Sequence, residues 1–207
     1  MGCRDPPAEL LRLEEVPSMA SKLAPVPPMP EVTIALNELV PYSLRYYFNG
    51  RPDRPYYSSR RYDFGSSPLL LPLVRAFLDT CAAEHSTDYR YLFTLIGSEL
   101  ASNALKHSRS GLPGHNYTLL CERKRNGLRL ICRDDGIADD PTTSVHDRRY
   151  LSADPGGLDP DSDSGRGLAL VDALATDWGD NGRPGHRVVW FFLAYDLEDS
   201  VWPELAD

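Results

Sequence analysis

Apolar residues recurring at three- and four-residue steps predict a long helix over residues 88–108, a run with no proline and one glycine. A rotation of about 100° per residue from Glu99 places leucine and isoleucine side chains within about 60° of it, and Asn103 about 40° away. The opposite side then carries Gly97 and Ala101. We therefore expect Glu99 and Asn103 to continue the stripe that faces the interior. An unpartnered carboxylate there would cost several kcal/mol or take up a proton, so a polar partner is expected.

Two segments of alternating apolar and polar residues, 117–124 and 128–135, predict a pair of strands. They are joined through Asn126 and Gly127, a strong hairpin signal. A short strand is expected at 61–64 and an apolar closing strand at 186–196.

Two further helices are predicted, over 68–85 and 165–179, and Pro72 restricts the regular part of the first to the residues after it. The resulting order is β, α, α, β-hairpin, long loop, α, β. This order predicts an α+β fold, a two-layer sandwich whose mixed, mostly antiparallel sheet is covered by helices on one face.

The long loop, residues 136–164, is rich in Asp, Gly and Pro and has little periodicity. A loop of this length inside a compact domain is usually a lid or a binding loop. Three regions are expected along the chain: a Pro-rich and aromatic extension over 1–59, a compact domain over 60–196 and a tail over 197–207. We expect the aromatic part of the extension to pack onto the domain or onto a second copy rather than to stack nucleobases.

Composition restricts the classes of partner. Hydrophobic residues make up 42% of the chain, enough for a core, and the formal net charge of −8 disfavours a nucleic-acid or anionic-membrane surface. No apolar run approaches the ~20 residues of a membrane span, and a signal-peptide pattern is missing. The four cysteines show no CxxC spacing, so a zinc site is not expected. A reducing, cytoplasmic location is expected.

Two short stretches outside the long helix carry candidate binding chemistry. Gly165 and Gly167, at a helix start, can bring backbone N–H groups close to a phosphate, and Arg166 adds a charge-assisted contact. Asp134, at a strand end, is placed to accept a hydrogen bond at the floor of a pocket, and Gly136 lets a planar group approach the backbone. Each signal is weak alone, because Asp-Gly after a strand is usually a turn.

Taken together and in this order, the three stretches resemble the ATPase domain shared by DNA gyrase, heat-shock chaperones, histidine kinases and MutL, the GHKL or Bergerat-fold superfamily. The sequence ELASNALKHS (99–108) is similar to the N box, 134–138 to the first glycine box and 165–170 to the second. The closing RVVWFFL is similar to the last strand of the anti-sigma-factor serine kinases. The resemblance covers roughly residues 60–195 and implies a Bergerat fold with an ATP lid.

For the helix, the resemblance implies that Asn103 binds Mg²⁺ through its carbonyl oxygen and that Glu99 orients or deprotonates an attacking hydroxyl. Lys106 and His107 would border the phosphates. Both are equally explained by complementing the dipole at the helix C-terminus. Glu99 and Asn103 also have a purely structural interpretation, as satisfied polar groups of the core.

For the glycine boxes, the resemblance implies that Asp134 accepts the adenine amino group and that Gly136 makes room for the ring. Ala138 stands where a third glycine is usual, which makes the hinge of the lid stiffer. The phosphate end would be held by residues of the second box, namely Gly165, Arg166, Gly167 and Leu168.

The function implied is an ATP- and Mg²⁺-dependent regulatory protein, a serine/threonine kinase of the anti-sigma-factor type. Its partner would be a sigma factor or an antagonist of the anti-sigma factor, and a homodimer is compatible with the aromatic extension. The alternative is a non-catalytic module in which ATP only switches the shape of the lid.

Overall fold

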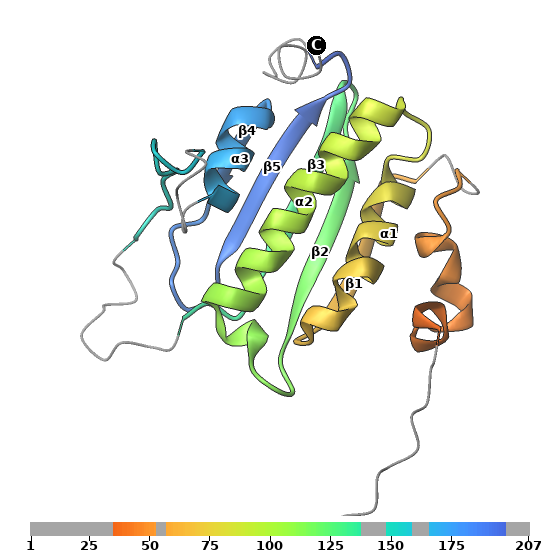
Figure 1. Ribbon diagram of the computed structural model, residues 1–207, viewed down its shortest axis with the longest axis horizontal. Helices are drawn as coiled ribbons and strands as arrows, with labels where there is room; N and C mark the ends of the chain where they lie inside the picture. Colours follow the sequence, from red (N-terminus) through yellow and green to blue (C-terminus); the bar gives the residue numbers. More distant parts are fainter. Residues whose placement is uncertain (1–34, 53–56, 138–147, 159–165, 198–207) are drawn as a thin grey trace, which may run out of the picture. The chain divides into compact units, whose positions relative to one another are not determined.

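The computed structural model describes residues 35–52, 57–137, 148–158 and 166–197. Within them, five antiparallel strands form one sheet in the order β1-β2-β3-β5-β4 (Figure 1). The strands are β1 (Ser59–Gly65), β2 (Asn116–Arg123), β3 (Gly127–Arg133), β4 (Asp177–Asp180) and β5 (Val188–Ala194). β2 and β3 form the expected hairpin, with Cys121 opposite Leu130.

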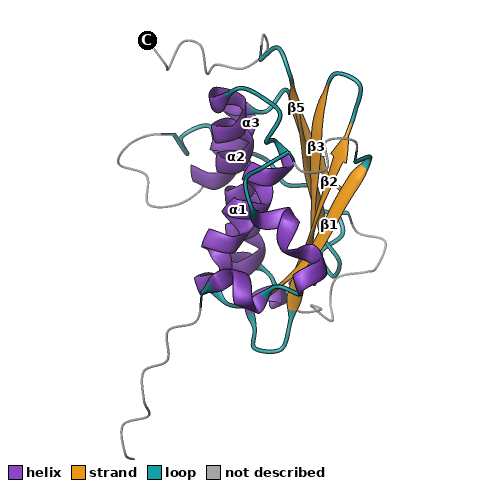
Figure 2. Ribbon diagram, turned by 90° about the vertical axis from the view of Figure 1, so that its right-hand side faces the viewer, coloured by secondary structure: helices purple, strands orange, loops and turns teal. Residues whose placement is uncertain are grey.

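Three helices cover one face of the sheet: α1 (Leu71–Cys81), α2 (Thr87–His107) and α3 (Arg166–Leu174) (Figure 2). Short 3-10 helices η1 (Leu36–Leu39), η2 (Tyr42–Phe48), η3 (Pro68–Leu70) and η4 (Arg109–Gly111) complete the described elements. The predicted α+β two-layer sandwich is therefore confirmed. No helix in the described part of the chain is long and apolar enough to cross a lipid bilayer.

The central helix, α2, begins where the Ser86 hydroxyl accepts a hydrogen bond from the Tyr89 N–H at 3.3 Å, a typical N-cap. Its buried face differs from the predicted one. Gly97 and Ala101 are buried, and a Cβ on Gly97 would lie 2.7 Å from the Leu78 side chain of α1. The prediction that they face away was wrong, because α2 lies between two helices and buries more than one stripe.

Glu99 and Asn103 are half-buried on the flank of α2 that faces α3. They lie beside the buried stripe of the helix and not at its centre. Their side-chain ends lie next to Gly167 at the start of α3, so any polar partner would meet them from the side and not from the sheet beneath.

The predicted helix over 165–179 ends earlier than expected. α3 stops at Leu174, and Asp177–Asp180 forms the edge strand β4, which pairs with β5. A four-residue segment has too little periodicity to indicate a strand, and its structure comes from pairing with β5. The Trp178 Nε1–H donates to Asp172 of α3 at 2.8 Å, which links strand and helix.

The aromatic segment before the sheet packs onto α1. The rings of Tyr47 and Phe48 lie 6.0 and 5.9 Å from the Phe77 ring. The Gly50 N–H donates to the Thr80 hydroxyl at 2.7 Å, and the Tyr57 hydroxyl donates to a carbonyl at the end of α1. These described residues therefore contact their own domain.

Candidate functional site

A cavity of about 370 Å³ opens between α2, α3 and the ends of β3 and β5. This volume is within the range of small-molecule sites. Its walls are mostly apolar, with a few polar groups at two ends. The lining residues are Leu100, Asn103, Ala104, His107, Ser108, Cys132, Asp134, Gly136, Ile137, Leu151, Ser152, Asp154, Gly167, Leu168, Arg187 and Val189.

Asp134 lies at one end of the cavity, directly after β3. One oxygen of its carboxylate accepts the Gly136 N–H at 2.6 Å. Burial raises the pKa of the Asp134 carboxyl, and the Gly136 N–H and the positive charge of Arg187 oppose that rise. The site therefore holds a partly desolvated carboxylate that can accept a hydrogen bond from a ligand.

Gly136 forms a turn between two other backbone segments. Its φ is +62°, and a Cβ there would lie 1.8 Å from the Pro184 carbonyl oxygen. That carbonyl accepts the Ile137 N–H at 2.9 Å, while the Gly136 carbonyl accepts the Arg109 N–H at 2.7 Å. Glycine is thus required here by the turn between β4 and β5, and not only by the room that a planar ligand would need.

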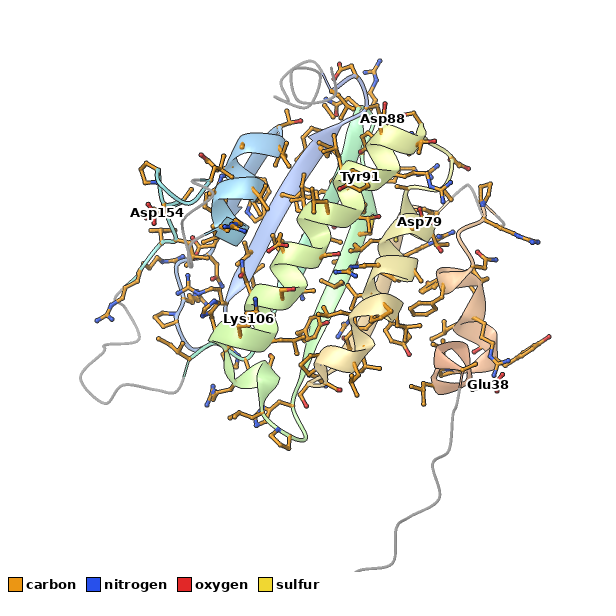
Figure 3. The ribbon with its side chains drawn as sticks, in the orientation of Figure 1. Glu38, Asp79, Asp88, Tyr91, Lys106 and Asp154 are labelled. Atoms are coloured by element: carbon orange, nitrogen blue, oxygen red, sulfur yellow. The ribbon has the colours of Figure 1, made fainter. Side chains whose placement is uncertain are left out.

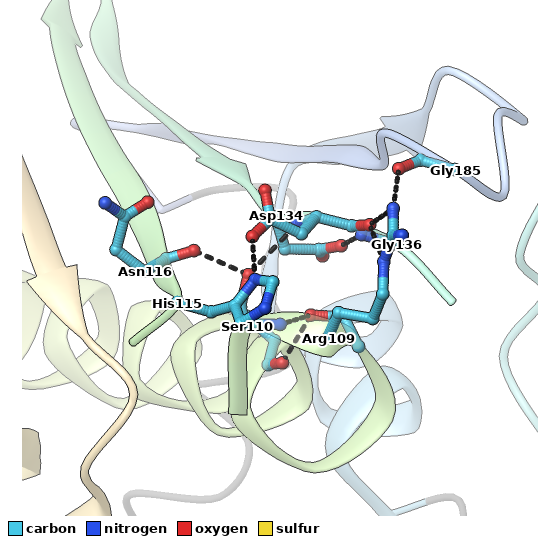
Figure 4. A network of polar contacts seen from close by, with 10 residues as sticks. Arg109, Ser110, His115, Asn116, Asp134, Gly136 and Gly185 are labelled. Atoms are coloured by element: carbon cyan, nitrogen blue, oxygen red, sulfur yellow. Dashed lines mark hydrogen bonds and ion pairs between the residues drawn. The ribbon is translucent and has the colours of Figure 1, made fainter. Parts of the chain in front are cut away.

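Three residues just after α2 hold the same turn and were not predicted as part of the site (Figure 4). Arg109 donates through Nε and Nη2 to the Asp135 carbonyl at 3.1 and 2.9 Å. The Ser110 hydroxyl accepts the Asp135 N–H at 3.0 Å, and His115 Nδ1 lies 2.8 Å from the Asp135 carboxylate. Their position directly after the N-box stretch was the available signal, but nothing local indicates which segment they contact.

At the other end of the cavity, α2 meets the first turn of α3. A Cβ on Gly167 would lie 2.9 Å from Glu99 Oε2 and 3.2 Å from Asn103 Oδ1. The N-box side chains are therefore in contact with the start of the second glycine box, which lies far from them in the sequence. A side chain at position 167 would therefore displace the ends of the Glu99 and Asn103 side chains.

Several predicted site residues line the cavity, and others do not. Those that line it are Asn103, His107, Asp134, Gly136, Gly167 and Leu168. Glu99 lies beside the cavity next to Gly167, and Lys106 is exposed near the C-terminal end of α2 (Figure 3). Arg166 is exposed at the start of α3. Ala138 and Gly165 lie outside the described residues.

The described part of the predicted lid forms one wall. Leu151, Ser152 and Asp154 line the cavity. The segment is held by the turn between β4 and β5, because the Arg149 N–H donates to the Gly182 carbonyl at 2.8 Å and the Leu151 N–H to the Asp180 carboxylate at 3.1 Å. The remaining predicted lid residues, 138–147 and 159–164, lie outside the described residues.

Comparison with known families agrees with this geometry. The family model of the histidine kinase-like ATPase domain matches residues 64–191, more than half of the chain. The chain therefore belongs to the histidine kinase-like ATPase domain family, as the resemblance to the GHKL superfamily predicted. No match was found among curated proteins.

Family membership indicates ATP binding, and the cavity presents groups that a nucleotide can contact. Apolar side chains such as Leu100 and Val189 can cover the faces of a purine ring, and Asp134 offers an acceptor at its edge. Asn103 lies at the other end, next to Gly167, where a phosphate chain needs polar contacts, and His107 lines the cavity at the C-terminal end of α2.

Proposed function

We propose that this protein binds Mg·ATP and transfers the terminal phosphoryl group to a serine or threonine hydroxyl of a partner protein, as a regulatory kinase of the anti-sigma-factor type. One observation carries the proposal. Glu99 and Asn103, a carboxylate and an amide on the flank of α2, converge on Gly167 at the start of α3. A candidate base, a candidate metal ligand and a helix N-terminus thus meet at one end of the cavity.

At the phosphate end, the Asn103 carbonyl oxygen would be the protein ligand of Mg²⁺. The described residues contain no group of three or more His, Cys, Asp or Glu that could hold a metal, so phosphate oxygens and water would complete the coordination. When bound, ATP supplies the phosphoryl group and Mg²⁺ neutralises part of the phosphate charge. Glu99 would accept the proton of the incoming hydroxyl.

The other roles are proposed from the family resemblance. Asp134 would accept the adenine amino group, with Gly136 in the turn beneath the ring. Lys106 and His107, at the end of α2, would border the phosphates. Gly165, Arg166, Gly167 and Leu168 would hold the phosphate end, where backbone N–H groups at a helix start favour negative charge.

The partner we propose is a protein, either a sigma factor held by this domain or the antagonist that it phosphorylates in the cytoplasm. The formal net charge of −8 supports a protein over a nucleic acid. A second copy of the chain is the other protein that the aromatic extension would contact.

The test is a phosphotransfer assay with radiolabelled Mg·ATP and a candidate antagonist, combined with calorimetric titration of the nucleotide. Glu99→Gln should keep ATP affinity and lower phosphotransfer about 10²- to 10⁴-fold, the usual contribution of a general base. Asn103→Ala should weaken Mg·ATP binding itself. Asp88→Asn, an exposed carboxylate at the other end of α2 (Figure 3), is the control and should change neither.

Two outcomes would redirect the proposal. Tight Mg·ATP binding without transfer to any antagonist would leave the switch module, in which the nucleotide changes only the lid. No binding of any adenine nucleotide would overturn both functions.

A further inference from the structure

Arg187 is the cross-strand neighbour of Asp134. The Asp134 N–H donates to the Arg187 carbonyl at 3.0 Å, which extends the β3–β5 pairing one residue beyond Arg133 and Val188. Residues directly opposite on antiparallel strands project to the same face, with Cβ atoms about 4.5–5.5 Å apart. Both side chains line the cavity. An arginine placed in this way would ordinarily pair with the carboxylate, because the Arg–carboxylate hydrogen bond is a strong one.

In the described part of the chain, however, no hydrogen bond or ion pair joins the two side chains. Arg187 Nη1 donates instead to Asp180 Oδ2 at 2.7 Å, and at 3.3 Å to the Arg149 carbonyl in the lid wall. The Asp180 side chain is only 2% exposed. Arg187 is therefore directed away from Asp134 by a second, buried carboxylate.

Asp180 is held in place for this contact by backbone donors from both sides. Its Oδ2 also accepts the Gly182 N–H at 3.1 Å, and its Oδ1 accepts the Leu151 N–H at 3.1 Å. A carboxylate with two backbone donors and an arginine is well satisfied although it is buried. The Arg187 guanidinium thus has two candidate partners, Asp134 and Asp180, and it binds Asp180, the carboxylate that backbone N–H groups hold in place.

We propose that Asp180 is a positioning residue: by holding Arg187, it keeps the Asp134 carboxylate open to accept a hydrogen bond from the bound nucleotide. Without the charge of Asp180, Arg187 would turn to Asp134 and occupy the acceptor that the base needs. The inference rests on the proposed role of Asp134 in binding the base. The raised pKa of the Asp134 carboxyl agrees with an acid that has no direct ion pair.

Three variants separate this role from a purely structural one. Asp180→Asn keeps an acceptor for the Leu151 N–H but loses the charge that holds Arg187. Asp180→Asn/Arg187→Met removes both members of the pair at similar volume. Arg187→Met alone removes the group that would block Asp134. The matched control is Asp177→Asn/Arg183→Met, which makes the same exchanges at exposed positions of β4 and the following turn.

The first measurement needs no nucleotide. An NMR titration of the Asp134 carboxyl should show a lower pKa in Asp180→Asn than in the wild type, because an opposite charge in contact favours the ionised form. In the double variant, that pKa should rise above the wild-type value. The other groups around this carboxyl are unchanged in all variants: Asp135 next to it, the Ser108 hydroxyl bonded to it, and His107 and Asp154 in the same cavity. An unchanged pKa in Asp180→Asn would overturn the inference.

The second measurement is calorimetric titration with Mg·ATP. Asp180→Asn should weaken binding about tenfold or more, the scale of one lost charge-assisted hydrogen bond, and the double variant should return to within about threefold of the wild type. Arg187→Met changes a residue of the cavity wall and is therefore followed by NMR, where the pKa of Asp134 should rise above the wild-type value as in the double variant. A loss of affinity in Asp180→Asn that the double variant does not reverse contradicts the inference. Absence of binding in the wild type would instead contradict the proposed function, and the NMR result would still decide the role of Asp180.

Discussion

Gly136 and Gly167 both lie against other atoms of the site, but Gly136 faces backbone and Gly167 faces the ends of side chains. Gly136 faces the backbone of the turn between β4 and β5, with the Pro184 carbonyl 1.8 Å from where a Cβ would be. Backbone cannot give way without changing the turn. Gly167 faces the ends of the Glu99 and Asn103 side chains, which can rotate away. Substitution should therefore damage folding at Gly136 and ligand binding at Gly167.

Gly167→Ala tests this distinction. The added Cβ would lie 2.9 Å from Glu99 Oε2 and would displace the N-box side chains. We expect Mg·ATP affinity to fall about tenfold, by calorimetry. The helix propensity of alanine, about 1 kcal/mol better than that of glycine, should keep the melting temperature near the wild-type value. Gly65→Ala, where a Cβ meets only Leu70 at 3.6 Å, is the control. Unchanged affinity in Gly167→Ala would contradict the assigned contact.

The ionised Asp134 carboxylate should lower the free energy of unfolding while it serves ligand binding. Burial raises its pKa above the ordinary 3.8, so the folded state takes up a proton more readily than the unfolded chain. The ionised carboxylate therefore destabilises the fold at pH values above the raised pKa. This cost decreases as the pH falls through the raised pKa and is absent below 3.8.

Asp134→Asn should consequently raise the free energy of unfolding at pH 7 and weaken ATP binding. The amide oxygen can still accept the Gly136 N–H, so the turn should remain. Denaturant unfolding at a series of pH values should show the gain in stability shrinking as the pH falls toward 4. A variant less stable than the wild type at pH 7 would show that the carboxylate stabilises the turn instead.

At the scale of elements, α2 determines the position of most of the site. It lies between α1 and α3 and above the sheet (Figure 1). Its flank toward α3 carries Glu99 and Asn103, and its end leads into the residues that clamp the turn at Gly136. Because α2 packs against α1, α3 and the sheet, one helix fixes the relative positions of the residues at both ends of the cavity.

A buried hydroxyl of α1 holds the backbone of the aromatic segment before β1 at Gly50. Thr80 is 2% exposed, and its Oγ1 accepts the Gly50 N–H while donating to the Ala76 carbonyl, both at 2.7 Å. Thr80→Val keeps the volume and leaves the Gly50 N–H without this acceptor. We expect a loss of about 1–3 kcal/mol in the free energy of unfolding and faster proteolysis within residues 35–52.

The same exchange at Thr118, whose hydroxyl contacts Asp63 on an exposed part of the sheet, is the control. It should change stability by no more than about 0.5 kcal/mol. Equal effects of the two variants would mean that the hydroxyl of Thr80 does not anchor the segment.

At the scale of the whole molecule, an acidic protein with a net charge of −8 is expected to bind a polyanionic nucleotide. The metal and the local donors must overcome the average repulsion. We expect Mg·ATP at one hundred times its Kd to add about 2.7 kcal/mol of stability, or roughly 5–10 °C in Tm for a domain of this size.

Thermal melts with Mg·ATP, ATP with chelator and Mg·GTP would measure this. Mg·ATP should give the largest shift, because Asp134 would accept from an amino group that guanine does not carry at the same ring position. Asn103→Ala should remove the difference between the melts with and without Mg²⁺. Equal shifts with ATP and GTP would contradict base recognition by Asp134.

The sequence alone was enough for the features that depend on near neighbours in the chain. The helix over 88–108, the hairpin at Asn126-Gly127 and the order of the helices and strands other than β4 follow from hydrophobic period and turn chemistry. The three polar stretches were also visible, because each is a short segment whose residue types suggest its chemistry. These signals led to the fold and to the family.

Tertiary structure alone decided the rest, because it depends on segments that meet only after folding. The short strand β4 exists through its pairing with β5, and the flank on which Glu99 lies is set by the helices on either side of α2. The pairing of Asp180 with Arg187, and not of Asp134 with Arg187, depends on backbone donors from Gly182 and Leu151. A local sequence pattern cannot predict which of several residues will pair when the fold brings them together.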